Sequence, residues 1–205
     1  TGLSGQSFLY LLVLAWPTFV LNSALWAQCD VIYAGLAVGG IYLSLRGRPY
    51  LGAGSFALAL GFKLQAVFLL PMGLVLWGMG KLRVKHILFA VLFYFVPMVP
   101  AVLGGMPASR IFTVYITQAQ QYKGLVMGAP SMYQLTQATG SQAPMFVFLG
   151  IALAAVAVFA LCAYLLQKRR HLTPVLLWDA CFLMATLLPF LLPRMHERYF
   201  YLAEC

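Results

Sequence analysis

Three short clusters of ionisable and hydrogen-bonding side chains interrupt an otherwise apolar sequence. They read "WAQCDVIY" (26–33), "GFKLQAVFLLP" (61–71) and "PRMHERYFY" (193–201). Each places a charged group at or just inside the end of an apolar run, where an unpaired charge at membrane depth costs about 3 kcal/mol. A helix that only had to be stable would carry leucine there. These groups are therefore candidates for function, with mutual pairing or bound water as the structural alternative.

The side chains of the clusters have the chemistry to bind a phosphate and to assist a sugar transfer. Lys63 supplies a point charge, and the guanidinium groups of Arg194 and Arg198 supply planar donors that suit phosphate oxygens. A sugar transfer also needs a base that takes the proton of the acceptor hydroxyl while the glycosyl phosphate departs. Asp30 is the candidate catalytic base.

The other site candidates would bind substrate. Glu197 lies between two basic residues in the sequence, so we expect it to be neutralised by them and to hold the cluster in place. An interfacial anchor of arginine and tyrosine at a helix end is the structural alternative for this last cluster. The substrate-binding candidates besides Lys63, Arg194 and Arg198 are Gln28, Tyr33, Gln65, His196, Glu197 and Tyr199.

Composition assigns the chain to the membrane class. Of its 205 residues, 63% are hydrophobic and 8% are charged, whereas about a quarter of a soluble domain is charged. Lys and Arg outnumber Asp and Glu by 13 to 4, but they are scattered between apolar runs, so no nucleic acid is expected as a partner. Two carboxylates near one face would allow a divalent metal, but no ligand spacing supports one, and no cofactor is predicted.

Seven apolar stretches come near the roughly 20 residues that a helix needs to cross a membrane. They predict an all-α, polytopic transmembrane helix bundle that forms a single domain over residues 1–205. The second, third and fourth stretches are short, so we expect them to be tilted, packed inside the bundle or flanked by half-buried loops. The seven are Phe8–Ala24, Val31–Leu45, Pro49–Leu64, Gln65–Met79, Ile87–Gly104, Pro144–Gln167 and Leu172–Leu192.

The charges test the alternation of these segments. If all seven cross, eight of the 13 Lys and Arg fall in short loops on one side, which the positive-inside rule assigns to the cytoplasm. The three clusters then share the opposite, outer face. The cytoplasmic set is Arg46, Arg48, Lys81, Arg83, Lys85, Lys168, Arg169 and Arg170, with His86 and His171 beside them.

The outer segment Gly105–Ala143 is expected to contain a helix that lies on the membrane surface. Ser109 is a suitable N-cap, and Ile111, Tyr115, Ala119 and Tyr122 fall on one face at helical spacing. Such a long connection in a compact protein is usually functional, which favours a lid or a substrate-binding platform. Because nucleotide sugars are kept in the cytosol, a transferase with an outer site would take its sugar from a lipid phosphate at headgroup level.

Four stretches resemble the GT-C superfamily of integral-membrane glycosyltransferases, in particular bacterial members akin to the mannosyltransferase of GPI-anchor assembly. They read "NSALWAQCDVIYA", "LRGRPYLGAGSFALALGFKLQAVFLLP", "APSMYQL" and "LPRMHERYFYLA", and the likeness covers most of residues 16–203. The resemblance implies an inverting transfer of mannose or another hexose from a polyprenyl-phosphate donor to a glycan or lipid acceptor. It also implies a bacterial inner-membrane protein whose site faces the periplasm or exterior.

Two departures from the family pattern bear on the site. The pattern around Asp30 usually reads Gly-Gln-x-Asp, and Ala27 stands where that glycine would be. Family members also carry the presumed catalytic acid in a first outer loop, which this sequence lacks. We therefore expect the chain to be a fragment of a longer protein, inactive alone, in which Asp30 could instead position the donor or the acceptor.

Two other functions remain open from the residues. A transporter or a flippase of lipid-linked saccharides would line a path through the membrane with ionisable groups. Only Asp179 lies deep in an apolar segment, and we expect it to form hydrogen bonds within the bundle. A polysaccharide polymerase or ligase would share the outer basic cavity.

Overall fold

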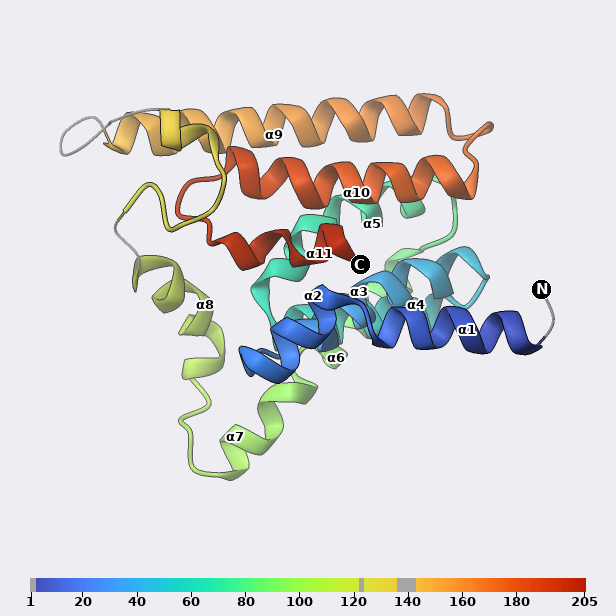
Figure 1. Ribbon diagram of the computed structural model, residues 1–205, viewed down its shortest axis with the longest axis horizontal. Coiled ribbons are helices and arrows are strands. Elements are labelled where there is room, and N and C mark those ends of the chain that lie inside the picture. The colour runs from blue at the N-terminus through green and yellow to red at the C-terminus, as the bar shows by residue number, and fades with distance from the viewer. Residues whose placement is uncertain (1–2, 122–123, 136–142) are drawn as a thin grey trace.

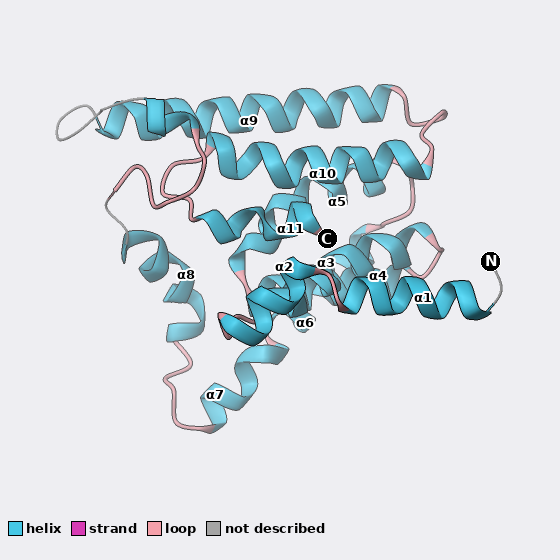
Figure 2. Cartoon of the chain, in the orientation of Figure 1, coloured by secondary structure: helices cyan, strands magenta, loops and turns pink. Residues whose placement is uncertain are grey.

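The computed structural model describes residues 3–121, 124–135 and 143–205, and within these ranges it is helical with no strand (Figure 2). The all-α prediction is thereby confirmed. The longer helices are α1 (Leu3–Leu14), α3 (Asp30–Leu45), α4 (Pro49–Phe62), α5 (Leu70–Gly78), α6 (Val84–Tyr94), α8 (Arg110–Gln121), α9 (Ala143–Gln167) and α10 (Pro174–Leu191). The short ones are α2 (Pro17–Val20), α7 (Val99–Leu103), α11 (Tyr201–Glu204), the π-helical turn η1 (Leu21–Leu25), and the 3₁₀ turns η2 (Leu64–Leu69), η3 (Val96–Met98), η4 (Met132–Leu135) and η6 (Glu197–Phe200).

Proline begins several of these helices. Pro17, Pro49, Pro71 and Pro174 occupy the first turn of α2, α4, α5 and α10, where the missing N–H removes no helical hydrogen bond. The side chain of Thr173 caps α10 by accepting a hydrogen bond of 3.2 Å from the backbone N–H of Leu176. Local sequence therefore sets where these helices start.

Fewer helices are long enough to cross a membrane than the seven predicted. Within the described ranges, three stretches qualify by length and composition: Val84–Leu103, Ala143–Gln167 and Pro174–Leu191. A fourth qualifies if Gly5–Leu14 and Pro17–Leu25, which meet at 46°, form one broken span. Helices α3 and α4 have 16 and 14 residues and rise only about 24 and 21 Å, short of a hydrocarbon core of about 30 Å.

The arrangement of the helices gives the molecule two distinct ends. Helices α9 and α10 run antiparallel, and the turn between them lies at the same end of the molecule as the turn between α3 and α4 (Figure 1). The opposite end holds the C-terminal end of α10 and the loop 124–135 (Figure 1). Two of the predicted basic loops are thus grouped apart from the predicted site segments.

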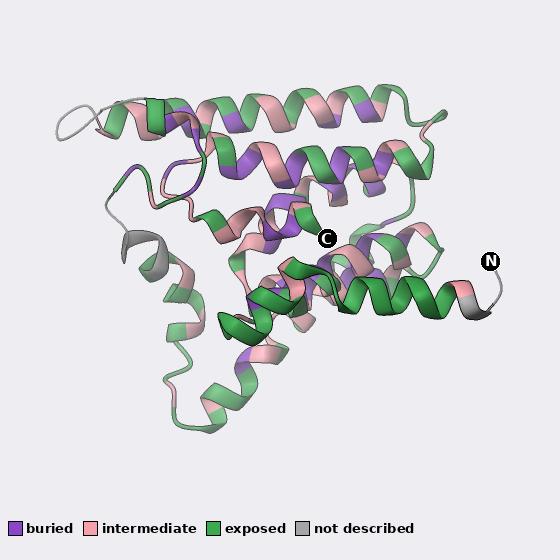
Figure 3. Cartoon of the chain, viewed as in Figure 1, coloured by how far each residue is buried: buried purple, intermediate pink, exposed green. Residues whose placement is uncertain are grey.

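Close packing of α3 against α4 forms the base of the site. A β-carbon on Gly52 would lie 2.1 Å from Ser44 Oγ, and one on Gly40 would lie 2.9 Å from the carbonyl oxygen of Gly52. The two helices therefore meet at backbone distance, as small residues allow in membrane proteins. Burial concentrates in this pair, in α5 and in α10, whereas α1 is exposed along nearly its whole length (Figure 3).

The amphipathic helix predicted in the outer segment is present as α8, which begins directly after Ser109. Its Tyr115 hydroxyl donates to the carbonyl oxygens of Leu60 at 2.6 Å and Gly61 at 3.2 Å. Ile111 and Tyr115 are half-buried, as the face prediction requires. The side chains of Ala119 and Tyr122, on the same predicted face, lie outside the described residues.

Candidate functional site

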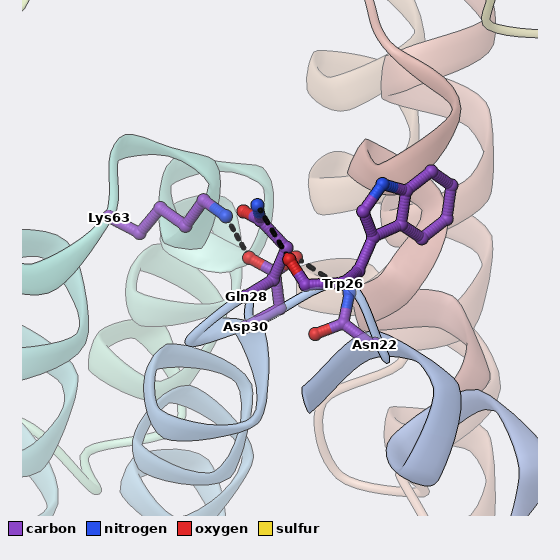
Figure 4. A network of polar contacts seen from close by, with 5 residues as sticks. All are labelled: Asn22, Trp26, Gln28, Asp30 and Lys63. Carbon is purple, nitrogen blue, oxygen red and sulfur yellow. Dashed lines mark hydrogen bonds and ion pairs between the residues drawn. The ribbon is translucent and has the colours of Figure 1, made fainter. Parts of the chain in front are cut away.

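The buried Asp30 forms an ion pair with the half-buried Lys63, which links two of the predicted clusters. Asp30 begins α3 and is 1% exposed, and Lys63 occupies the junction between α4 and η2. The ammonium group contacts Asp30 Oδ1 (Figure 4). A carboxylate in the first turn of a helix is also favoured by the helix dipole. Burial and pairing together give this carboxylate a fixed position.

Asn22 holds the second oxygen of the same carboxylate. Its amide Nδ2 donates to Asp30 Oδ2 at 3.0 Å, and the side chain is buried (Figure 4). The sequence reasoning missed this residue, although a lone amide inside the apolar run "FVLNSALW" was the available signal. Gln28, a predicted binding residue, instead directs its amide to the carbonyl oxygen of Trp26 at 3.4 Å (Figure 4).

The loop between Asn22 and Asp30 is held in a strained conformation. The N–H of Gln28 donates to the carbonyl oxygen of Asn22 at 3.0 Å, and that of Trp26 donates to Leu21 at 3.0 Å. Ala27 has φ of 50°, in the left-handed region that costs a residue with a β-carbon about 1–2 kcal/mol. This is the position where the resemblance expects glycine.

A further predicted residue, Tyr33, lies beside the pair. It is one turn along α3, is 1% exposed, and has its ring centroid 5.7 Å from Lys63 Nζ, a cation–π contact. Its hydroxyl is buried and has no hydrogen-bond partner among the described residues. Gln65 Oε1, two residues after Lys63 in the sequence, is likewise buried without one.

The third cluster is hydrogen-bonded to the loop 124–135. The N–H of Arg194 donates to the carbonyl oxygen of Leu125 at 2.9 Å, and that of Ala129 donates to Met195 at 3.4 Å. The Tyr133 hydroxyl donates to the carbonyl oxygen of Leu191 at 2.7 Å. We call residues 124–135 together with 191–197 the clasp. Arg194 has φ of 64°, so backbone strain occurs here as well.

Glu197 corrects one expectation. Its side chain is exposed and, within the described ranges, forms no ion pair with His196 or Arg198. Its carboxylate lies instead against Gly128 of the clasp, and the φ of Gly128 is 91°. The ring of His196 packs edge-on against Tyr199, with the centroids 5.4 Å apart. Within the described ranges Glu197 is therefore not paired with its basic neighbours, and its carboxylate contacts the loop instead.

Helix α11 continues from the clasp towards the ion pair. Its Tyr201 is 3% exposed, and its ring lies 5.8 Å from that of Phe19. Burial, then Cys205 and Asp30, raise the pKa of the Tyr201 phenol, which places Asp30 within electrostatic reach and keeps the phenol protonated. The Tyr201 hydroxyl has no hydrogen-bond partner among the described residues.

The structure therefore unites part of the predicted site. Asp30, Lys63 and Tyr33 come together, whereas the backbone hydrogen bonds of the third cluster run to the loop 124–135. The convergence of all three clusters in one pocket stays a prediction. No group of three or more His, Cys, Asp or Glu side chains gathers as a metal site within the described part of the chain.

Asp179 corrects a second expectation. Its side chain is exposed on α10 and has neither a hydrogen bond nor an ion pair with any described residue. The sequence could not reveal which face of α10 the bundle covers, because the helix is apolar on all sides. Asp179 therefore has no polar contact with the residues of the candidate site.

An apolar pocket of about 640 Å³ is lined by residues of α3, α4, α5 and α6. Part of its lining, including Ile87 and Val91, belongs to the candidate membrane span Val84–Leu103. Small residues such as Ala53, Ala57 and Gly73 line the pocket and leave its space open. Leu60 and Val67 also line it, and both are close to Lys63 in the sequence. Its volume is within the ~300–1,000 Å³ of small-molecule pockets.

Comparisons of the chain with protein-family models, with curated proteins and with solved structures find no match. Function must therefore be inferred from the buried Asp30–Lys63 pair and the groups around it.

Proposed function

We propose that this chain is part of a membrane glycosyltransferase that moves a hexose from a polyprenyl-phosphate donor to a glycan or lipid acceptor. The observation that carries the proposal is the buried Asp30 carboxylate, fixed by Lys63 on one oxygen and by Asn22 on the other. A buried charge pair is a costly way to stabilise a fold, since apolar residues of similar volume often do as well. Its retention beside unpartnered polar atoms favours a role in binding or chemistry.

The proposed step needs one base and one anion site. The acceptor hydroxyl oxygen attacks the anomeric carbon while the bond from that carbon to the phosphate oxygen breaks. The phosphate leaves with the bonding pair, and Asp30 takes the hydroxyl proton on a lone pair not engaged by Lys63 or Asn22. The Lys63 ammonium neutralises charge on the departing phosphate.

The apolar pocket supports a lipid-linked donor. The hydrogen-bonding side chains of its lining are Ser44, Trp77 and Tyr94, and the rest is apolar, so it suits a hydrocarbon chain better than a sugar. The Ser44 hydroxyl is already bonded, because it donates to the carbonyl oxygen of Gly40 at 2.8 Å. A donor with its chain in this pocket would carry its phosphate towards the α4–η2 junction, where Lys63 lies.

The test uses the full-length protein in proteoliposomes with radiolabelled polyprenyl-phosphate mannose or another hexose. Asp30→Asn is expected to lower kcat more than it raises the donor KM if Asp30 is the base, and the reverse if it only positions the donor. His196→Ala and Arg198→Ala are expected to abolish transfer while leaving membrane insertion intact. Asp179→Asn is the matched control, because it removes an exposed acid that has no polar contact with the site.

Two outcomes would overturn the proposal. Wild-type transfer in Asp30→Asn, His196→Ala and Arg198→Ala would remove the site from the reaction. Movement of the labelled lipid between leaflets without any transfer would identify a flippase instead.

A further inference from the structure

Packing alone does not explain why position 22 carries an asparagine. It belongs to the π-helical turn η1 and is its only buried residue, because Leu21, Ser23, Ala24 and Leu25 are all exposed. Insertions of this kind into helices occur frequently at functional sites. A residue that only filled this position would be apolar, since burying an amide costs free energy unless it is hydrogen-bonded.

Of the two polar atoms of the Asn22 amide, only the nitrogen has a hydrogen-bond partner among the described residues. Nδ2 donates to Asp30 Oδ2 at 3.0 Å, whereas Oδ1 is buried without a hydrogen-bond partner among the described residues. The Asn22 amide thus donates to the Asp30 carboxylate while its own oxygen Oδ1 stays buried without a described partner. An orphaned acceptor of this kind costs about 1–3 kcal/mol, which stability alone would not retain.

The backbone around Asn22 reinforces the same contact. Its carbonyl oxygen accepts the N–H of Gln28 at 3.0 Å, so Asn22 anchors the loop that leads into Asp30. The positive φ of Ala27 closes that loop. One residue therefore holds Asp30 through its side chain and through its main chain.

We propose that Asn22 is the positioning residue of the reaction: its amide fixes the rotation of the Asp30 carboxylate so that the free lone pairs face the acceptor hydroxyl. This inference rests on the proposed glycosyl transfer. Lys63 alone would leave the carboxylate free to rotate about the contact at Oδ1, whereas two partners on two oxygens define one orientation. Misplacement of a reacting group by about 1 Å can lower a rate on the order of 100-fold.

The experiment compares Asn22→Leu, Asn22→Gln and Asn22→Thr in the full-length protein, with Ser23→Leu as the control on the exposed side of the same turn. Asn22→Leu is expected to lower kcat by roughly 10- to 100-fold with the donor KM nearly unchanged. Gln or Thr, which keep a donor, should recover part of that loss. A structural role would instead lower the amount of folded protein and leave kcat per folded molecule intact.

Infrared spectroscopy separates failure of this inference from failure of the proposed function. The carboxylate band that Asp30→Asn removes should shift in frequency in Asn22→Leu and not in Ser23→Leu. If the wild-type protein transfers no sugar, the proposed function fails, and an unshifted band then overturns the positioning role as well. A wild-type kcat in Asn22→Leu would overturn it even where transfer is observed.

Discussion

The carboxylate of Glu197 lies against the α-carbon of Gly128, so that a β-carbon on Gly128 would fall 2.8 Å from Glu197 Oε2. The contact joins the loop 124–135 to the segment that follows α10. With the backbone hydrogen bonds of Arg194 and Met195 to the same loop, it makes the clasp one structural unit. The loop 124–135 is thus fixed to the third predicted cluster.

The first prediction concerns Gly128→Ala. The Glu197 side chain is flexible and can move aside, so the main cost comes from the φ of 91° and should be about 1–2 kcal/mol. Thermal unfolding in detergent should show a lower midpoint. Gly35→Ala is the control, because Gly35 lies inside α3 with open space around it and should become more stable. An unchanged midpoint in Gly128→Ala would show that the clasp does not constrain this residue.

The second prediction concerns Lys63→Met. Removing the ammonium leaves a buried carboxylate without its charge partner, which should cost about 3–5 kcal/mol of stability. The double variant Asp30→Asn with Lys63→Met should be more stable than Lys63→Met alone, because no uncompensated charge remains. Unfolding midpoints of the four proteins give the coupling. Lys81→Met, at an exposed lysine, should change the unfolding midpoint little. Additive effects of Asp30→Asn and Lys63→Met on stability would contradict the ion pair.

The third prediction concerns Ala27→Gly, which installs the residue that the resemblance expects. Glycine adopts the φ of 50° without the left-handed cost of about 1–2 kcal/mol, but it loses about 0.5–1 kcal/mol through the freedom of the unfolded chain. A small net stabilisation should follow. Ala24→Gly, in the helical turn before it, should destabilise by up to about 1 kcal/mol. Equal losses in both variants would mean that the loop at Ala27 is not strained.

Much of this architecture was predictable from local sequence. Proline and threonine fix the helix starts, and the cost of charges at membrane depth singled out Asp30 and Lys63 as functional candidates, with their pairing as the structural alternative. The number of crossing helices was overestimated because Pro17 breaks the first stretch and because apolar runs of 14–16 residues were counted as spans.

The contacts between distant segments were not predictable. The bonds of Leu125 to Arg194 and of Ala129 to Met195 are made by main-chain atoms, which every residue carries, so side-chain identity does not specify them. Asn22 was missed because one neutral amide does not alter an apolar pattern. Its role depends on a fold that brings η1 against the start of α3.

The last prediction concerns Tyr115, which fastens α8 to the end of α4. Burial, together with Tyr94, raises the pKa of Tyr115 to about 12, from an ordinary value of 10.0. Because the folded-state pKa is the higher one, the stability contributed by the protonated phenol is fully present below about pH 10 and is lost as the pH rises through about 12. Tyr115→Phe should therefore have a lower unfolding midpoint than the wild type at pH 8, and the difference between the two midpoints should narrow above pH 11.

Removal of the Tyr115 hydroxyl, which donates to Leu60 and Gly61, should cost about 1 kcal/mol of stability and increase hydrogen exchange across α8. Tyr164→Phe, at an exposed tyrosine of α9, is the control. Equal hydrogen exchange in Tyr115→Phe and the wild type would show that α8 is held by other contacts.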